Sequence, residues 1–173
     1  EAARSGARLT PLGDGRVLLT GGQAGALPLP ITTWIFDPDG GTFDPGPGPT
    51  TPRRDHTASD VGRGNVLVLG GRDDLDGNAL SVVEVLTAGQ PPFLGEPLAT
   101  ARWQHTATVL AGNEGVLVAG GRGATGEPLA DVEIYNPTGA GSTTPLAAAE
   151  ALAFARAGHT ATPIADGRFV LIA

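Results

Sequence analysis

The chain repeats one motif, and this repetition limits the fold more than any other feature of its 173 residues. The motif is Arg-x-x-His-Thr-Ala, followed by an apolar run and a Gly-Gly pair. It begins at Arg53, Arg102 and Arg156, a degenerate copy begins at Arg4, and its fourth position holds all three histidines of the chain, His56, His105 and His159. The Gly-Gly pairs recur every 49 or 50 residues, at Gly21-Gly22, Gly70-Gly71 and Gly120-Gly121. Self-similarity at this period predicts an array of similar structural units.

Each unit is predicted to contain four short β-strands. In the second repeat, residues 56–61 alternate in polarity, residues 65–69 form an apolar run, and two further strands are expected at residues 83–86 and 92–94. A continuous apolar run indicates an inner strand that is covered on both faces. The Gly-Gly pair after it permits positive φ and close approach of another backbone. Large side chains at one position of the third strand are expected to pack between units: Phe36, Leu86 and Tyr135.

These motifs resemble the kelch repeat, through Arg-x-x-His-Thr-Ala, the Gly-Gly pair and the Val-Glu-Ile-Tyr-Asn-Pro segment at Val132–Pro137. The resemblance implies an all-β fold, a β-propeller of four-stranded antiparallel kelch blades. The fourth-strand Trp common in that family is Phe43 or Phe93 here and is not recognisable in the third repeat. The repeats cover residues 4–52, 53–101 and 102–155, with a half repeat at 156–173, or about 3.5 blades. Because closure needs about four to eight blades, we expect a fragment of a longer propeller, completed by its remaining blades or by partner chains.

The alternation of strand direction predicts which loops share a face. The connections between the second and third strands and the connections between repeats emerge on the same side, which we take as the candidate ligand-binding face. That face would carry four arginines near the central channel, which are Arg53, Arg54, Arg102 and Arg156. Guanidinium groups bind carboxylates in a bidentate manner, so acidic carbohydrates or acidic protein segments are candidate ligands. The alternative is that each arginine pairs with an acidic residue or with carbonyl groups between blades.

Two other residue sets have the composition of a metal site. His56, His105 and His159 fall one per repeat, so we expect hydrogen-bonded packing at each inner strand, with ligand contact as the alternative and no shared metal ion. Asp73, Asp74 and Asp76 resemble part of a calcium loop, but the distal bidentate Glu is missing and a solvated loop is the simpler interpretation. Residues 145–154 favour helix by composition, with an irregular outer strand as the alternative.

Charge and motif content restrict the function. The net charge of −7 without a basic stripe disfavours nucleic acid, and no apolar run approaches the about 20 residues that membrane insertion requires. The expected function is a non-catalytic binding or scaffold module without a cofactor, on a secreted or cell-envelope protein. One alternative is a carbohydrate-active kelch enzyme, either a sugar isomerase or a copper oxidase. The oxidase is disfavoured because its site needs a Cys cross-linked to Tyr and the chain has no Cys. The other alternative is a structural subunit of a surface assembly.

Overall fold

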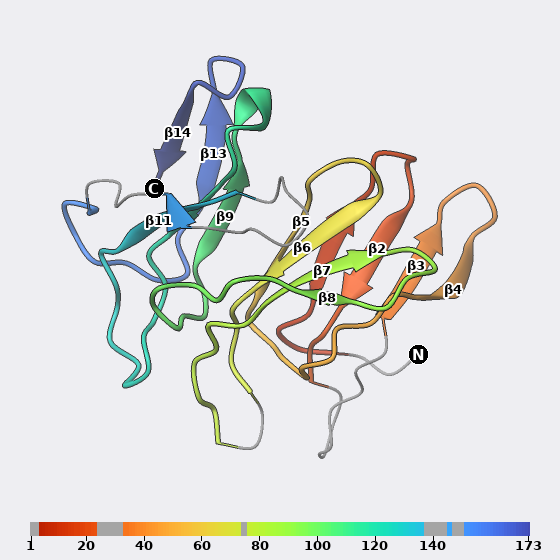
Figure 1. Ribbon diagram of the computed structural model, residues 1–173, viewed down its shortest axis with the longest axis horizontal. Coiled ribbons are helices and arrows are strands. Elements are labelled where there is room, and N and C mark those ends of the chain that lie inside the picture. The colour runs from red at the N-terminus through yellow and green to blue at the C-terminus, as the bar shows by residue number, and fades with distance from the viewer. Residues whose placement is uncertain (1–3, 24–32, 74–75, 137–144, 147–150) are drawn as a thin grey trace.

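The computed structural model describes residues 4–23, 33–73, 76–136, 145–146 and 151–173. These residues form an all-β structure of small antiparallel sheets, which follow one another in the order of the sequence (Figure 1). No α-helix occurs among them, and the single helical element is the 3-10 turn η1 (Ala111–Asn113). The expected array of similar units is therefore present as a series of successive sheets.

Three of the sheets have four strands and one has two. The first sheet contains β1 (Arg8–Pro11), β2 (Val17–Thr20), β3 (Thr33–Asp37) and β4 (Thr42–Gly46). The second contains β5 (Thr57–Asp60), β6 (Asn65–Leu69), β7 (Val83–Thr87) and β8 (Phe93–Leu94). The third contains β9 (Thr106–Val109), β10 (Val116–Ala119), β11 (Val132–Tyr135) and β12 (Pro145–Leu146), and the fourth contains β13 (Ala161–Ile164) and β14 (Phe169–Ile172).

Each four-stranded sheet is a meander in which every strand pairs with the strand that precedes it in the sequence. The sequence around the outer strand of the third sheet favours helix by composition. In the structure, Leu146 pairs with Ile134 and Pro145 with Tyr135, so residues 145–146 form the irregular outer strand instead of a helix. Proline is tolerated there because an edge strand needs no second set of hydrogen bonds. The rest of the expected helix lies partly outside the described residues, at positions 147–150.

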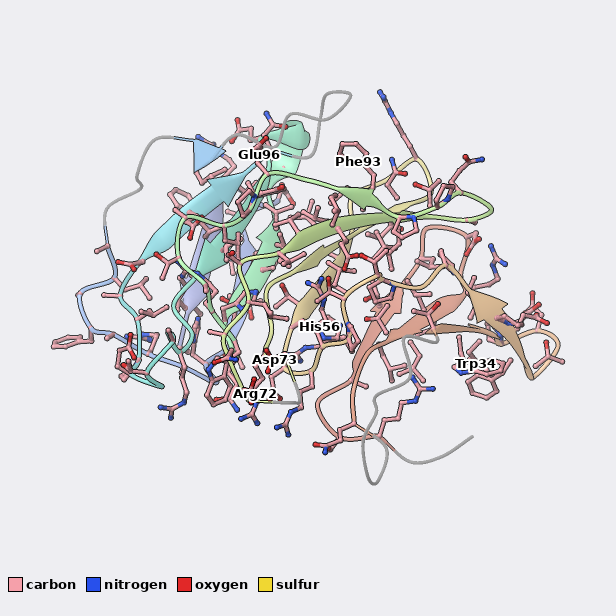
Figure 2. All side chains as sticks on the ribbon, turned by 60° about the horizontal axis from the view of Figure 1, so that its bottom comes forward. Trp34, His56, Arg72, Asp73, Phe93 and Glu96 are labelled. Atoms are coloured by element: carbon pink, nitrogen blue, oxygen red, sulfur yellow. The ribbon has the colours of Figure 1, made fainter. Side chains whose placement is uncertain are left out.

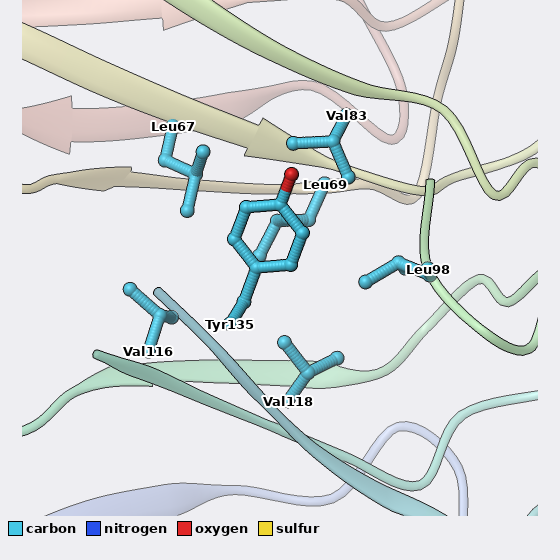
Figure 3. Packing of buried hydrophobic residues seen from close by; sticks show 7 residues of the cluster. All are labelled: Leu67, Leu69, Val83, Leu98, Val116, Val118 and Tyr135. Carbon is cyan, nitrogen blue, oxygen red and sulfur yellow. The ribbon is translucent and has the colours of Figure 1, made fainter. Parts of the chain in front are cut away.

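Strand β6 explains why the motif contains an apolar run. Its alternate residues point to opposite sides and bury against different sheets. Val66 and Val68 pack with Leu18, Ile35 and Leu86, which connects the first and second sheets. On the other side, a second cluster joins the second and third sheets and surrounds the ring of Tyr135; its remaining members are Leu67, Leu69, Val83, Leu98, Val116 and Val118 (Figure 3). The apolar core thus lies between the sheets.

The three large third-strand residues occupy equivalent registers, because each lies opposite a valine at or near the start of the second strand. The pairs are Phe36 with Val17, Leu86 with Val66 and Tyr135 with Val116. Leu86 and Tyr135 are buried between sheets. Phe36 is only half-buried and packs against Phe43, with ring centroids 4.9 Å apart. The difference arises because, in the described part of the chain, no sheet precedes the first one and covers Phe36.

The Gly-Gly pairs lie where successive repeats touch. Gly70 has φ +55°, and a Cβ added there would lie 2.6 Å from the carbonyl oxygen of Arg102 and 3.0 Å from Cε1 of His105. Gly120 has φ +58° and meets Arg156 and His159 in the same way. The Gly-Gly pair of one repeat and the Arg-x-x-His segment of the next are therefore two halves of one contact between sheets, which is why they recur together.

Candidate functional site

Two of the four predicted arginines lie inside the protein. The Nη1 atom of Arg102 donates to the carbonyl oxygens of Gly120 at 2.9 Å and Asp131 at 3.0 Å, and Nη2 donates to Glu133 at 2.6 Å. Arg53 repeats the arrangement with the carbonyls of Gly70 and Val82 and with the carboxylate of Glu84. Both arginine side chains are fully buried. Their guanidinium groups therefore pair with an acidic residue and with carbonyls, and neither group is exposed to a ligand.

These buried arginines connect neighbouring sheets. The main-chain carbonyl of Arg53 accepts a hydrogen bond from Gly22 of the first sheet at 3.0 Å, and its side chain binds the second sheet. The carbonyl of Arg102 accepts from Gly71 at 2.9 Å in the same way. Burial lowers the pKa of both guanidinium groups below their usual value, and the charges of Glu84 and Glu133 oppose that effect. Breaking such a pair leaves one charge buried without compensation, which is strongly destabilising.

Sequence analysis did not single out the two acidic partners. A usable signal existed, because Glu84 and Glu133 each interrupt an otherwise apolar third strand at the same repeat position. A charged residue that recurs inside an apolar strand needs a partner when it is buried.

The three histidines occupy equivalent places between sheets, but they do not converge. The Nε2 atom of each histidine contacts the threonine hydroxyl of the preceding sheet: His56 with Thr20 at 2.8 Å, His105 with Thr57 at 2.9 Å and His159 with Thr106 at 3.0 Å. Burial, together with the positive charges of Arg53 and Arg8, lowers the pKa of His56 to about 3. The described residues contain no group of three or more His, Asp or Glu that could hold a metal ion.

Arg54 lies next to the buried Arg53 but belongs to a different environment. Its Nη1 donates to the side-chain oxygen of Gln23 at 2.9 Å, and its backbone pairs with that of Arg72 in the same repeat. Arg72 and Asp73 lie at one edge of the molecule, and His56 lies farther inside (Figure 2). We call this edge the loop face, defined by Arg54, Arg72, Trp103 and Arg122.

An aromatic ring organises the loop face. The Cζ atom of Arg72 lies 4.2 Å from the centre of the Trp103 ring, and that of Arg122 lies 5.7 Å from it. The Nε atom of Arg72 also donates to the carboxylate of Asp55 at 2.8 Å, and Nε of Arg122 donates to the side-chain oxygen of Gln104 at 3.3 Å. Cation–π contacts of this kind fix the orientation of a guanidinium group. Sequence analysis missed Arg72, Arg122 and Trp103, although the two arginines both follow a Gly-Gly pair directly.

A polar cavity adjoins the loop face. It has a volume of about 500 Å³ and is lined by the first strands of successive sheets and by the residues just before them, including Arg8, Asp55, Gln104 and His105. Asp55 and Gln104 adopt positive φ of 54°, and the amide of Gln104 donates to the carbonyl of Asp55 at 3.0 Å. Because Asp55 both lines the cavity and binds Arg72, the loop-face arginines and the cavity form one continuous polar region.

The acidic loop closes on itself. One carboxylate oxygen of Asp73 accepts from the amides of Asp76 at 3.2 Å and Asn78 at 3.1 Å, and the other accepts from the side chain of Asn78 at 3.3 Å. Asp74 lies outside the described residues. These bonds are those of a turn in which the carboxylate replaces a backbone acceptor.

Comparison of the sequence with models of known protein families and with curated proteins finds no match. Within the described ranges, no helix has the length and apolar character needed to cross a membrane. The chain is an all-β protein that contains several small four-stranded antiparallel sheets, joined by buried Arg–Glu pairs.

Proposed function

We propose that the sheets are blades of a kelch-type β-propeller and that the protein is a non-catalytic binding module, on a secreted or cell-envelope protein. Its ligand carries carboxylates and binds at the loop face. The observation that carries this proposal is the arrangement of Arg72 and Arg122 around Trp103, beside the polar cavity. Two oriented cations next to a polar depression match an anionic ligand.

Arg72 has the donors that such a ligand needs. In the described part of the chain its guanidinium group donates only through Nε, to Asp55, and its side chain is 25% exposed. The two Nη nitrogens remain for a ligand, and a guanidinium group binds a carboxylate best through two parallel hydrogen bonds. Because Trp103 and Asp55 already hold the side chain in place, binding loses little conformational entropy.

The propeller arrangement is supported by the contacts between sheets. Strand β1 contacts β5, β5 contacts β9, and β9 contacts β13, so the first strand of each sheet lies beside the first strand of the next. Radial repetition of four-stranded meanders about an axis produces this pattern. The loops that carry Arg54, Arg72 and Arg122 would then surround one end of that axis.

The experiment compares binding of two carboxylate probes, a polyglutamate peptide and polygalacturonate, with binding of their neutral amide or methyl-ester forms. Arg72→Gln is expected to weaken binding of the charged probe about tenfold, since it removes a charge-assisted bidentate contact. The matched control is Arg16→Gln, which removes an exposed arginine whose ion pair in the described structure is with Asp14, two residues earlier. Equal affinity of the wild type and the Arg72 variant, with unchanged melting temperatures, would contradict the proposal.

A further inference from the structure

Two interfaces join the first three sheets, and they are built from equivalent residues. We call the contact between the first and second sheets the first interface and that between the second and third sheets the second interface. Three aliphatic positions are shared: Leu18, Val66 and Val68 in the first interface and Leu67, Val116 and Val118 in the second. The fourth position differs, because the residue opposite the equivalent valine is Leu86 in the first interface and Tyr135 in the second. A leucine therefore stands where the next interface has a phenol ring.

A cavity of about 340 Å³ lies beside Leu86 in the first interface. Its apolar wall is formed by Leu18, Ile35, Pro47, Val66 and Leu86. In the second interface, the residues equivalent to Leu18 and Val66 surround the ring of Tyr135 (Figure 3). Because leucine lacks the outer part of a phenol ring and its hydroxyl, space that Tyr135 fills in the second interface is open in the first. A cavity of this volume is large enough for a small molecule.

The cavity also keeps the hydrogen-bond acceptor of the missing tyrosine. The hydroxyl of Tyr135 donates to the main-chain carbonyl of Glu96 at 2.7 Å. Pro47 is the equivalent residue of the first repeat, because each of the two follows the glycine that pairs with the start of the third strand. The carbonyl oxygen of Pro47 accepts from the hydroxyl of Thr33 at 2.8 Å, and a carbonyl oxygen has a second lone pair for another donor.

The rim of the cavity is polar, but most of its charges are compensated within the protein. Asp14 pairs with Arg16 at 2.7 Å. The carboxylate of Asp60 accepts from the main-chain amides of two turn glycines, at 2.7 Å each. The fourth charged side chain, Arg63, is exposed to solvent. An apolar wall with one inner acceptor and a compensated rim suits a neutral ring that carries one donor.

We propose that the cavity of the first interface binds a small neutral molecule with a single phenol ring. The ring packs against Leu18, Val66 and Leu86, and the hydroxyl donates to the carbonyl oxygen of Pro47. The equivalent acceptor receives the hydroxyl of Tyr135 in the second interface. This site does not depend on ligand binding at the loop face, because none of the four residues that define the loop face lines the cavity.

The first test is NMR titration of the wild-type protein with phenol and with toluene. Phenol is expected to shift the methyl resonances of Leu18, Val66 and Leu86. The methyl groups of Leu67 and Val116 are the internal control, because Tyr135 already occupies their interface. Toluene has nearly the same size but no hydroxyl, so we expect it to bind about fivefold more weakly than phenol.

The second test fills the cavity from within. Leu86→Tyr restores the side chain of the second interface and is expected to abolish the phenol-induced shifts. The matched control is Leu94→Tyr, which makes the same substitution at a residue that is 59% exposed and outside the cavity, and it is expected to bind phenol as the wild type does. Thermal melting shows whether each variant is folded. If Leu86→Tyr does not fold, the comparison of phenol with toluene on the wild type still decides.

Four results would overturn the proposal. The first is the absence of shifts at the cavity methyl groups, and the second is unchanged phenol binding by a folded Leu86→Tyr variant. The third is tighter binding of toluene than of phenol, since a cavity that offers no acceptor favours the ring that loses less hydration. The fourth is tighter binding of N-acetyltyrosine amide than of phenol, which would make the ligand a tyrosine of a polypeptide. Failure of the loop-face proposal leaves these readouts unchanged, because Arg72→Gln is expected to bind phenol normally.

Discussion

Acidification is expected to destabilise the protein because its interior histidines must stay neutral. The pKa of His56 is lowered from 6.5 to about 3, first by burial and then by the positive charges of Arg53 and Arg8. In the unfolded chain the same imidazole binds a proton near pH 6.5. Between these two values the unfolded state holds more protons than the folded state, so stability falls as the pH falls.

The size of the effect follows from the pKa difference. Each pH unit below 6.5 costs about 1.4 kcal/mol for one such histidine, until the folded protein itself takes up the proton near pH 3. At pH 5.0, His56 therefore lowers the free energy of unfolding by about 2 kcal/mol. The pKa of the fully buried His105 is also lowered well below 6.5, mainly by burial, so it acts in the same direction.

The assay is urea unfolding at pH 7.5, 6.0 and 5.0, followed by tryptophan fluorescence, for the wild type and His56→Gln. Glutamine can still contact the Thr20 hydroxyl but does not titrate, so the variant is expected to lose about 2 kcal/mol less than the wild type between pH 7.5 and 5.0. NMR titration of the His56 Cε1 proton measures the folded pKa directly. A folded His56 that titrates near pH 6.5, or equal stability of the wild type at pH 7.5 and 5.0, would refute the reasoning.

Three further substitutions test the contacts between sheets, each by thermal and urea unfolding. Gly70→Ala is expected to cost about 3 kcal/mol or more, because its Cβ meets a carbonyl oxygen at 2.6 Å. Gly89→Ala shares the positive φ but has no atom within 4 Å, so an equal loss there would assign the effect to backbone strain alone. Glu133→Gln is expected to cost about 3 kcal/mol by leaving Arg102 uncompensated, whereas Asp14→Asn at an exposed pair leaves stability nearly unchanged. Tyr135→Phe removes a 2.7 Å hydrogen bond to a main-chain carbonyl and is expected to cost about 1 kcal/mol, and no loss would show that this bond contributes nothing.

The repeat motif predicted the strands because their signals are local. Alternation and apolar runs follow from the period of two in a strand, so β6, β7 and β8 lie at or next to their expected positions. The outer strand of the third sheet was harder to predict, since the alanine-rich sequence has no β-period. Among the described residues, Pro145 and Leu146 pair with β11. Local composition there indicates helix, but pairing with the neighbouring strand β11 makes residues 145–146 a β-strand.

The site depended on information that the motif does not contain. Arg53 and Arg54 are adjacent and chemically identical, but Arg53 is fully buried against Glu84 while Arg54 lies on the loop face. Successive residues of an extended chain point in opposite directions, so the difference follows from which side the next sheet covers. The contacts of Trp103 with Arg72 and Arg122 also form only in the folded protein, because the two arginines come from loops of different repeats.

The sequence by itself determined the repeating unit, its four short strands, and the requirement for glycine where an inner strand ends. These properties depend on residue periodicity and on φ, which neighbouring residues control. Only the tertiary structure decided that the carbonyl of Arg102 packs against Gly70 and that Glu133 neutralises the guanidinium group of Arg102. It also decided that Arg156 lacks a carboxylate partner among the described residues. These contacts join residues about 30 or more positions apart, and their energy depends on burial and charge pairing, which exist only after the sheets have packed.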